Sequence, residues 1–289
     1  LHGWKDSREL VMKIQLKILV YLVFTMIPMT SAFAEFDETK VIIEINATDG
    51  DAGFHALFDA EAWKEVRMDD PNGQKIFDEK AFASLRTQGL TENFFESAEP
   101  VCDPDDAEED EEPVSLEEFI SRFPAGLYKL YGKSNETEHF AGDAELTYNL
   151  PAAPEIDDGV AFWADNEEVV ISWAAGTTLG DKCHDQDLID AEIIDVVTGE
   201  DIIGWEVVVE PADDEGIEPL RVFSIQLPTD QTEVTVPWEF IETYMAVNDV
   251  DEFKFEVGAI EESGNQTFSE AEFCIVEEED GECEEEEED

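Results

Sequence analysis

Short runs in which apolar and polar residues alternate cover most of the chain beyond residue 40. Residues 41–47 are rich in β-branched side chains, and residues 63–77 hold two such runs on either side of Asp70-Pro71-Asn72-Gly73. Proline fixes one φ angle and Asn-Gly tolerates positive φ, so this tetrapeptide predicts a turn between two strands. The alternating runs at 123–132 and 139–150 predict a further hairpin.

One helix is expected among these strands. Ser115 is a good N-cap for residues 116–123, and Glu117 and Glu118 lie in the first turn, where the helix dipole favours negative charge. The apolar residues of this segment recur at helical spacing. They are Leu116, Phe119, Ile120 and Phe123.

Pro151 and Pro154 frame a stiff, extended link and predict a domain boundary. Short strands separated by turn residues follow it, and such a series is typical of a β-sandwich. The strands are expected at residues 168–173, 204–210, 221–228, 233–241, 252–260 and 268–276. We therefore expect an all-β protein of two β-sandwich domains in tandem, residues 35–150 and 151–276, with a short helix in the first.

Residues 152–276 resemble a fibronectin type III domain. The resemblance rests on the initial proline, on Trp173 at the end of the second strand, on the strand at 204–210, and on the tip at 262–265 between the last two strands. It also rests on an alternating run of Phe253, Phe255, Val257 and Ala259. The family usually has a tyrosine at the position of Phe253, so we expect packing alone to hold this corner.

This chain departs from the fibronectin type III pattern at a second place, and the first half of the chain has a weaker resemblance of its own. Residues 174–203 are a long insertion between the second and third strands, in which residues 187–197 are expected to form a short extra element. Residues 124–132 and 142–148 resemble the last hairpin of bacterial immunoglobulin-like domains. The whole chain is similar to exported bacterial proteins with a terminal fibronectin type III domain, which implies a fold and a location but no activity.

The first 34 residues have the order of a secretory signal peptide. Lys13 and Lys17 precede an apolar run at 18–29, and the small residues of Ala32-Phe33-Ala34 follow. We expect cleavage before Glu35 and a periplasmic or secreted product, with residues 1–11 as an extension upstream of the start at Met12. An uncleaved membrane anchor is the alternative, but the run is shorter than the ~20 residues of a membrane span.

The charge is strongly acidic and limits the classes of partner. The chain has 75 acidic and 16 basic residues, for a net charge of −59. This charge argues against binding to nucleic acid or to an anionic membrane surface, and it favours weak, nonspecific binding of cations. Adaptation to a salty medium, where counterions screen the self-repulsion, or simple solubility accounts for the charge better than a specific cation function does. Residues 103–112 and 277–289 are almost wholly acidic, and we expect a solvated loop and a disordered tail there.

Four cysteines lie beyond the signal: Cys102, Cys183, Cys274 and Cys283. Export permits disulfides, and four cysteines allow three pairings. In a fibronectin type III domain the loop after the second strand lies at the pole where the chain enters, so the resemblance implies that Cys183 faces Cys102. Cys274 and Cys283 are then left to close a short loop.

The chemistry-bearing residues form no motif, so we predict no catalytic, cofactor-binding or metal-binding residue. His55, His139 and His184 have no nucleophile motif near them. Asp49-Gly50-Asp51 lacks the acid spacing of a calcium loop, as does Asp103 with Asp105 and Asp106. Cys183-His184 lacks the four-ligand spacing of zinc, and no CxxC occurs.

These patterns favour a non-catalytic extracytoplasmic interaction or structural protein with an unknown protein or glycan partner. A carbohydrate-binding or calcium-binding adhesive module is one alternative. Trp173 is expected in the core, but Trp63, Trp163, Trp205 and Trp238 are available for a sugar-binding face. A secreted hydrolase with an unrecognised site in the first domain is the other alternative.

Overall fold

A computed structural model describes residues 34–105, 107, 112–134, 139–166, 168–212, 217, 221–248, 250–277, 281 and 283. The expected signal peptide and much of the two acidic segments lie outside these residues. Residues 35–289 form one compact unit. The fold is mostly β, as the alternating pattern predicts, and it has short helices in addition to the one expected at residues 116–123. No helix in the described part of the chain is long and apolar enough to cross a membrane.

The elements of the first half follow one another as strands with two short helices. They are β1 (Ala34–Glu35), β2 (Glu38–Asn46), β3 (Asp51–Asp69), β4 (Lys75–Lys80), α2 (Ala83–Gln88), β5 (Leu90–Glu96), α3 (Leu116–Arg122), β6 (Gly126–Ser134), β7 (His139–Leu146) and β8 (Asn149–Pro151).

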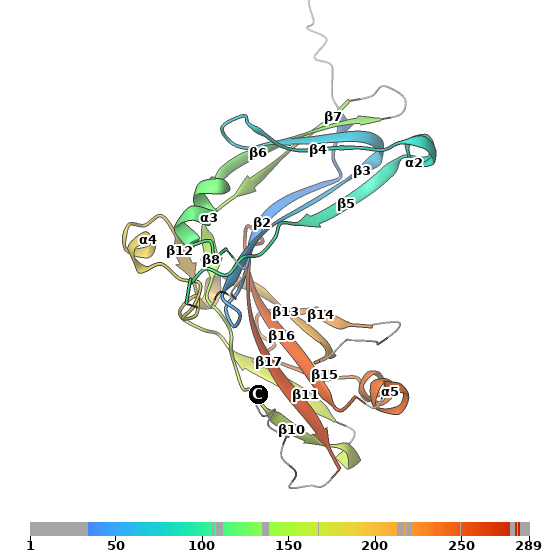
Figure 1. The fold of residues 1–289 in the computed structure, drawn as a ribbon, viewed down its shortest axis with the longest axis vertical. Helices are drawn as coiled ribbons and strands as arrows, with labels where there is room; N and C mark the ends of the chain where they lie inside the picture. The colour runs from blue at the N-terminus through green and yellow to red at the C-terminus, as the bar shows by residue number, and fades with distance from the viewer. Residues whose placement is uncertain are drawn as a thin grey trace, which may run out of the picture. The chain divides into compact units, whose positions relative to one another are not determined.

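The long strand β3 takes part in two groups of strands. Its first part pairs with β2 and β5, and its second part pairs with β4 and β6, which forms a hairpin with β7. The registers shift between Asp59 and Trp63 and again between Trp63 and Glu65. Irregularities of this kind let one strand pass from one layer to another. In Figure 1, β3 accordingly runs beside β2 and then beside β6.

One hydrophobic core cluster fills this half. Phe54 of β3 stacks on Phe123 with ring centroids 4.6 Å apart, and Tyr128 of β6 is fully buried. Helix α3 adds Leu116, Phe119 and Ile120 to the same cluster. The Ser115 hydroxyl accepts a hydrogen bond from the Glu118 amide at 3.3 Å, which confirms the predicted N-cap.

The second half continues with more strands and short helical turns. Its elements are β9 (Glu155–Ile156), β10 (Val160–Trp163), η1 (Ala164–Asn166), β11 (Val169–Ala174), α4 (Gln186–Asp190), β12 (Asp195–Val197), η2 (Gly199–Asp201), β13 (Ile202–Pro211), β14 (Phe223–Leu227), β15 (Glu233–Val236), α5 (Trp238–Asn248), β16 (Glu252–Glu261) and β17 (Gln266–Val276).

Two layers of strands share a second core cluster in this half. One layer has the order β15-β11-β9, and the other contains β14, β13, β16 and β17. Alternate residues of each strand enter the core, as in the contact of Trp173 of β11 with Trp205 of β13 at 6.0 Å between ring centroids. This arrangement is a β-sandwich.

The structure corrects two expectations about the second half. The strand expected at 233–241 ends at Val236, because Pro237 lacks an amide hydrogen and has the φ angle that starts helix α5. The corner near Phe253 is not held by packing alone. The hydroxyl of Tyr244, on α5, accepts from the Arg221 amide and donates to the Arg221 carbonyl, both at 2.6 Å.

The insertion at residues 174–203 packs against the first half. It contains α4 and β12, and β12 pairs in parallel with β8. Leu179, Cys183, Leu188 and Ile194 all belong to the first core cluster. The structure contains the disulfides Cys102–Cys183 and Cys274–Cys283, the same pairs that the resemblance implies.

Strand β17 joins the two halves into one sheet. Its residues Gln266–Phe268 pair in parallel with Glu44–Asn46 of β2, and the resulting sheet has 12 strands. Asn265, just before β17, is fully buried. Its side-chain oxygen accepts from the Ile43 amide at 2.8 Å, and its side-chain nitrogen donates to the Asn149 carbonyl at 2.8 Å.

Candidate functional site

A histidine on strand β3 is buried on the side of the strand that faces away from the core. Phe54 and Ala56 enter the first core, so the alternation of β3 places His55 on the opposite face. His55 is nevertheless only 3% exposed. The ring of Phe94, on β5, meets the imidazole edge to face at 5.8 Å, and two glutamates lie beside it.

The two glutamates lie at different nitrogens of the His55 ring. Nε2 is 2.7 Å from Oε1 of Glu99, which follows β5, and Nδ1 is 3.6 Å from Oε2 of Glu44 on β2. The register of β2 and β3 pairs Ile42 with His55, so Glu44 is the next residue of β2 on the same face. One imidazole is thus held between two carboxylates.

Burial and neighbouring charge alter the titration of this cluster. Burial raises the pKa of Glu44 to about 7, although the positive charge of His55 lowers it. Burial lowers the pKa of His55, but the hydrogen bond with Glu99 and the surrounding carboxylates outweigh this effect and raise it overall. The geometry therefore favours an imidazolium that donates its Nε2 proton to Glu99.

Glu44, His55 and Glu99 are also the residue types that bind metal ions, and their ligand atoms lie within 4.8 Å of one another. Imidazole with carboxylates suits zinc and other first-row divalent ions. An ion bound to Nε2 beside Glu99 would, however, have Glu44 at the far nitrogen of the ring. The arrangement therefore fits a bound proton better than it fits one metal ion.

A row of carboxylates continues across the neighbouring strands. Lys254 of β16 lies within 3.7 Å of three of them, with its Nζ 3.3 Å from Glu210, 3.5 Å from Glu270 and 3.7 Å from Glu256. Burial raises the pKa of Glu256 to about 6 and also raises the pKa of Glu270. The charge of Glu256 acts on Glu44, so this row and the His55 cluster are electrostatically connected.

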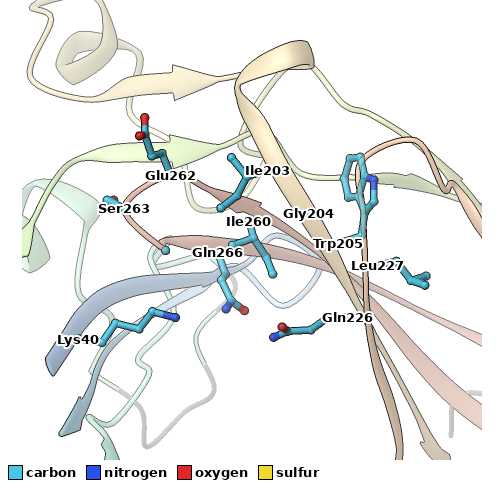
Figure 2. A pocket seen from close by; sticks show the side chains of 11 residues that line it. Lys40, Ile203, Gly204, Trp205, Gln226, Leu227, Ile260, Glu262, Ser263 and Gln266 are labelled. Carbon is cyan, nitrogen blue, oxygen red and sulfur yellow. The ribbon is translucent and has the colours of Figure 1, made fainter. Parts of the chain in front are cut away.

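A separate pocket of about 380 Å³ lies near the pairing of β2 and β17. Its walls come from β2, β13, β14, β16, the turn after β16, and β17 (Figure 2). Its titratable residues are Lys40 and Glu262. None of the groups with a shifted pKa lines it.

The structure does not bring the other sequence candidates together. His139 and His184 are exposed and are not grouped with His55. Asp49 accepts a hydrogen bond from Asn46 at 2.9 Å in the turn between β2 and β3. Asp103 accepts from the Asp105 amide at 2.9 Å, and Asp106 lies outside the described residues.

The tryptophans considered for a sugar-binding face do not gather on one. Trp63 is fully buried and Trp205 is 3% exposed, so both belong to the cores. Trp163 and Trp238 are half-buried. Trp173 is buried in the second core, as expected.

The sequence patterns did not indicate the His55 cluster. His55 and Glu99 are 44 residues apart, and no local spacing relates them. The available signal was Glu44, a charged residue in the middle of the apolar run at 41–47. A carboxylate there must lie on the outer face of β2, next to whatever polar residue the paired strand offers.

No protein-family model matches this sequence, and no curated protein is similar to it in sequence. Among solved structures, the chain is similar to the Ig1-2 module of the Drosophila receptor protein tyrosine phosphatase DLAR. The two are 12% identical, the superposition covers 84% of this chain and 98% of that chain, and the TM-score is 0.33. For a 1.5-MDa bacterial ice-binding adhesin, identity is 10%, coverage is 84% of this chain and 66% of that chain, and the TM-score is 0.25.

Trypsin-activated alpha-2-macroglobulin from Escherichia coli is 13% identical over 86% of this chain, with a TM-score of 0.28. The chain spans 16% of that structure and 66% of the adhesin structure, which is less than two thirds of either. At these TM-scores the superpositions do not establish a common fold with any of the three proteins.

Proposed function

We propose that the chain is a non-catalytic extracytoplasmic interaction or structural protein. It consists of an immunoglobulin-like module at residues 35–150 and a fibronectin type III-like module at 151–276, which act together as one stiff body. The strand order β15-β11-β9 packed against β14-β13-β16-β17 supports the assignment of the second module. The partner is a protein or a glycan of the extracytoplasmic space.

The junction between the modules is the observation that carries this proposal. The parallel pairing of β2 with β17 crosses it, and so does the Cys102–Cys183 disulfide. Asn265 hydrogen-bonds to residues on both sides of it, and its own amide donates to Glu261 Oε1 at 3.0 Å. A buried polar network with its partners in place fixes one arrangement of the elements that it joins.

The described residues favour binding over catalysis. All four cysteines are in disulfides, so none is a free nucleophile. Within the described residues, His55 contacts two carboxylates and the ring of Phe94, and His184 contacts a backbone carbonyl, so neither is paired with a serine hydroxyl. A catalytic site combines a pocket with groups whose pKa is shifted, but the carboxylates with raised pKa values, Glu44 and Glu256, lie outside the pocket. Two disulfides are in turn typical of an oxidising compartment.

Distance measurements between spin labels test the stiff junction. Unnatural amino acids that carry labels can replace the exposed residues Leu127 and Val222 of residues 35–289, which leaves the cysteines intact. We expect one narrow distance distribution in the native chain. The combination of C102S, C183S and N265A should broaden it, whereas the control pair C274S and C283S should not. A broad distribution in the native chain would contradict the proposal.

Weak, nonspecific cation binding is the second candidate function. Lys254 is the positive side chain beside Glu210, Glu256 and Glu270. Because these carboxylates repel one another, any further positive ion nearby stabilises their ionised forms. Calcium chloride and sodium chloride at equal ionic strength should then raise the melting temperature by similar amounts. A saturable effect of calcium alone would instead indicate a specific site.

A further inference from the structure

The pocket near the pairing of β2 and β17 contains two polar side chains that have no partner among the residues the structure describes. Gln266 is only 8% exposed, and its side-chain amide makes no hydrogen bond with any described residue. Lys40, at the opposite wall, likewise has no ion pair or hydrogen bond within the described part of the chain. In Figure 2 the ammonium of Lys40 points toward the amides of Gln266 and Gln226.

This combination of groups is suited to an anion. The Gln266 amide lines the pocket and has no partner among the described residues, so it is available to a ligand that accepts or donates a hydrogen bond there. Lys40 can only donate. A carboxylate can accept from the Lys40 ammonium and from the Gln266 amide at the same time. The other wall is apolar and contains Ile203, Leu227 and Ile260.

The surrounding charges select a singly charged ligand. Glu262 lies on the other side of the pocket from Lys40, and its carboxylate points away from the pocket (Figure 2). Glu206 accepts a hydrogen bond from Gln226 at 3.2 Å, so a second carboxylate lies close to the pocket wall. With one lysine in the lining and a net charge of −59, a phosphate or a polyanion would meet more repulsion than attraction.

We propose that this pocket binds a carboxylate that carries a short branched apolar group. Lys40 and Gln266 hold the carboxylate, and Ile203, Leu227 and Ile260 contact the apolar group. The volume of about 380 Å³ is in the range of small-ligand sites. A free carboxylic acid and the C-terminal residue of a peptide both offer this chemistry. The inference rests on the junction of the proposed function, because the first module supplies Lys40 and the second supplies Gln266 and the apolar wall. The spin-label distances test that junction separately, so a narrow distance distribution without binding of a carboxylate overturns this inference alone.

The test compares N-acetyl-leucine with its neutral analogue N-acetyl-leucinamide, using titration monitored by protein NMR on residues 35–289. We expect saturable binding of the acid, with shifts at the amides of the pocket residues. The amide should bind about 10- to 100-fold more weakly, since it lacks the charge that Lys40 pairs with. Equal binding of the two probes, or no saturable binding of the acid, would overturn the proposal.

Variants assign the effect to the two side chains. Lys40→Met keeps the length of the side chain and removes its charge, and it should weaken binding of the acid about 10- to 100-fold. Gln266→Met should weaken it by a smaller factor. Lys129→Met, on the exposed face of β6, is the matched control and should leave binding unchanged. Unchanged binding in Lys40→Met with an unchanged melting temperature would refute the role of Lys40.

Two further probes separate the sources of the ligand. 4-Methylpentanoate represents a free acid, and a short peptide that ends in leucine represents a chain terminus. Tighter binding of the peptide assigns the pocket to a C-terminus, and equal or tighter binding of the acid assigns it to a small molecule. Either result supports a carboxylate site, and failure of both probes to bind overturns it.

Discussion

Replacing Glu44 by glutamine should stabilise the protein at alkaline pH and leave it unchanged in acid. Burial raises the pKa of Glu44 to about 7, and this effect exceeds the attraction of His55. A group whose pKa is raised in the folded state holds its proton more tightly there than in the unfolded chain. Its contribution to stability is complete below its ordinary pKa and is lost as the pH rises through the folded value.

The size of the effect follows from the two pKa values. The interval from 4.5 to about 7 corresponds to about 3 kcal/mol once Glu44 is fully ionised. The side chain of Glu44 is 29% exposed, and the substitution also removes its contact of 3.6 Å with His55. We therefore expect Glu44→Gln to gain about 1–3 kcal/mol at about pH 8 and close to nothing at about pH 4.

Urea unfolding followed by tryptophan fluorescence at the two pH values measures this difference. Glu38→Gln is the matched control, because Glu38 is an exposed residue of the same strand. The control should show the same pH dependence as the native chain. If Glu44→Gln is instead less stable than the native chain at about pH 8, attraction between Glu44 and His55 outweighs burial and the reasoning is wrong.

Three further predictions concern the covalent and polar ties of the fold. Removing the Cys102–Cys183 disulfide, which spans 81 residues, should lower the free energy of unfolding by about 4–5 kcal/mol. Removing Cys274–Cys283, with a separation of 9, should lower it by about 3 kcal/mol, and equal losses in urea unfolding would refute this ordering. Asn265→Ala should lower the free energy of unfolding by about 3 kcal/mol or more, because it leaves the buried Ile43 amide without an acceptor. The control Asn149→Ala, at an exposed side chain, should lower it by less than about 0.5 kcal/mol, and similar values for both variants would contradict a structural role of Asn265. Tyr244→Phe should lower stability by about 1–2 kcal/mol through loss of both hydrogen bonds to Arg221, and no change in the urea midpoint would show that packing alone holds this corner.

Local chemistry in the sequence was enough to place many turns and strands. Asp70-Pro71-Asn72-Gly73 forms a turn in which the Asp70 amide donates to the Gln74 carbonyl at 2.8 Å and Gly73 has a φ of 80°. Pairing of the strand runs within each half also follows from alternation, as in the hairpin of β6 and β7. These features depend on residues close together in the chain, so the local sequence is enough to predict them.

Features that depend on distant residues were not predictable in the same way. The apolar residues from Ala52 to Met68 fit one strand or two, and only the packing of β2, β5, β4 and β6 decides that β3 is one bent strand with two sets of partners. Likewise, nothing near Leu188 indicates that the insertion fills the core of the first half.

The candidate site was missed for the same reason. Glu44, His55 and Glu99 come from three separate segments of the chain. Because the chain contains 75 acidic residues, two particular glutamates give no distinct signal in the sequence. Lys40 and Gln266 of the pocket are even further apart. Their common position follows from the parallel pairing of β2 with β17, which no short-range pattern predicts.

Hydrogen exchange in increasing urea tests most directly whether residues 35–276 unfold as one body. The amides of Val66 in the first core and Val207 in the second should converge on the same free energy of opening, because the strand pairing, the disulfide and Asn265 make the two halves open together. If one set of amides opens well below the other throughout the titration, the halves are independent and the proposed stiff body does not exist.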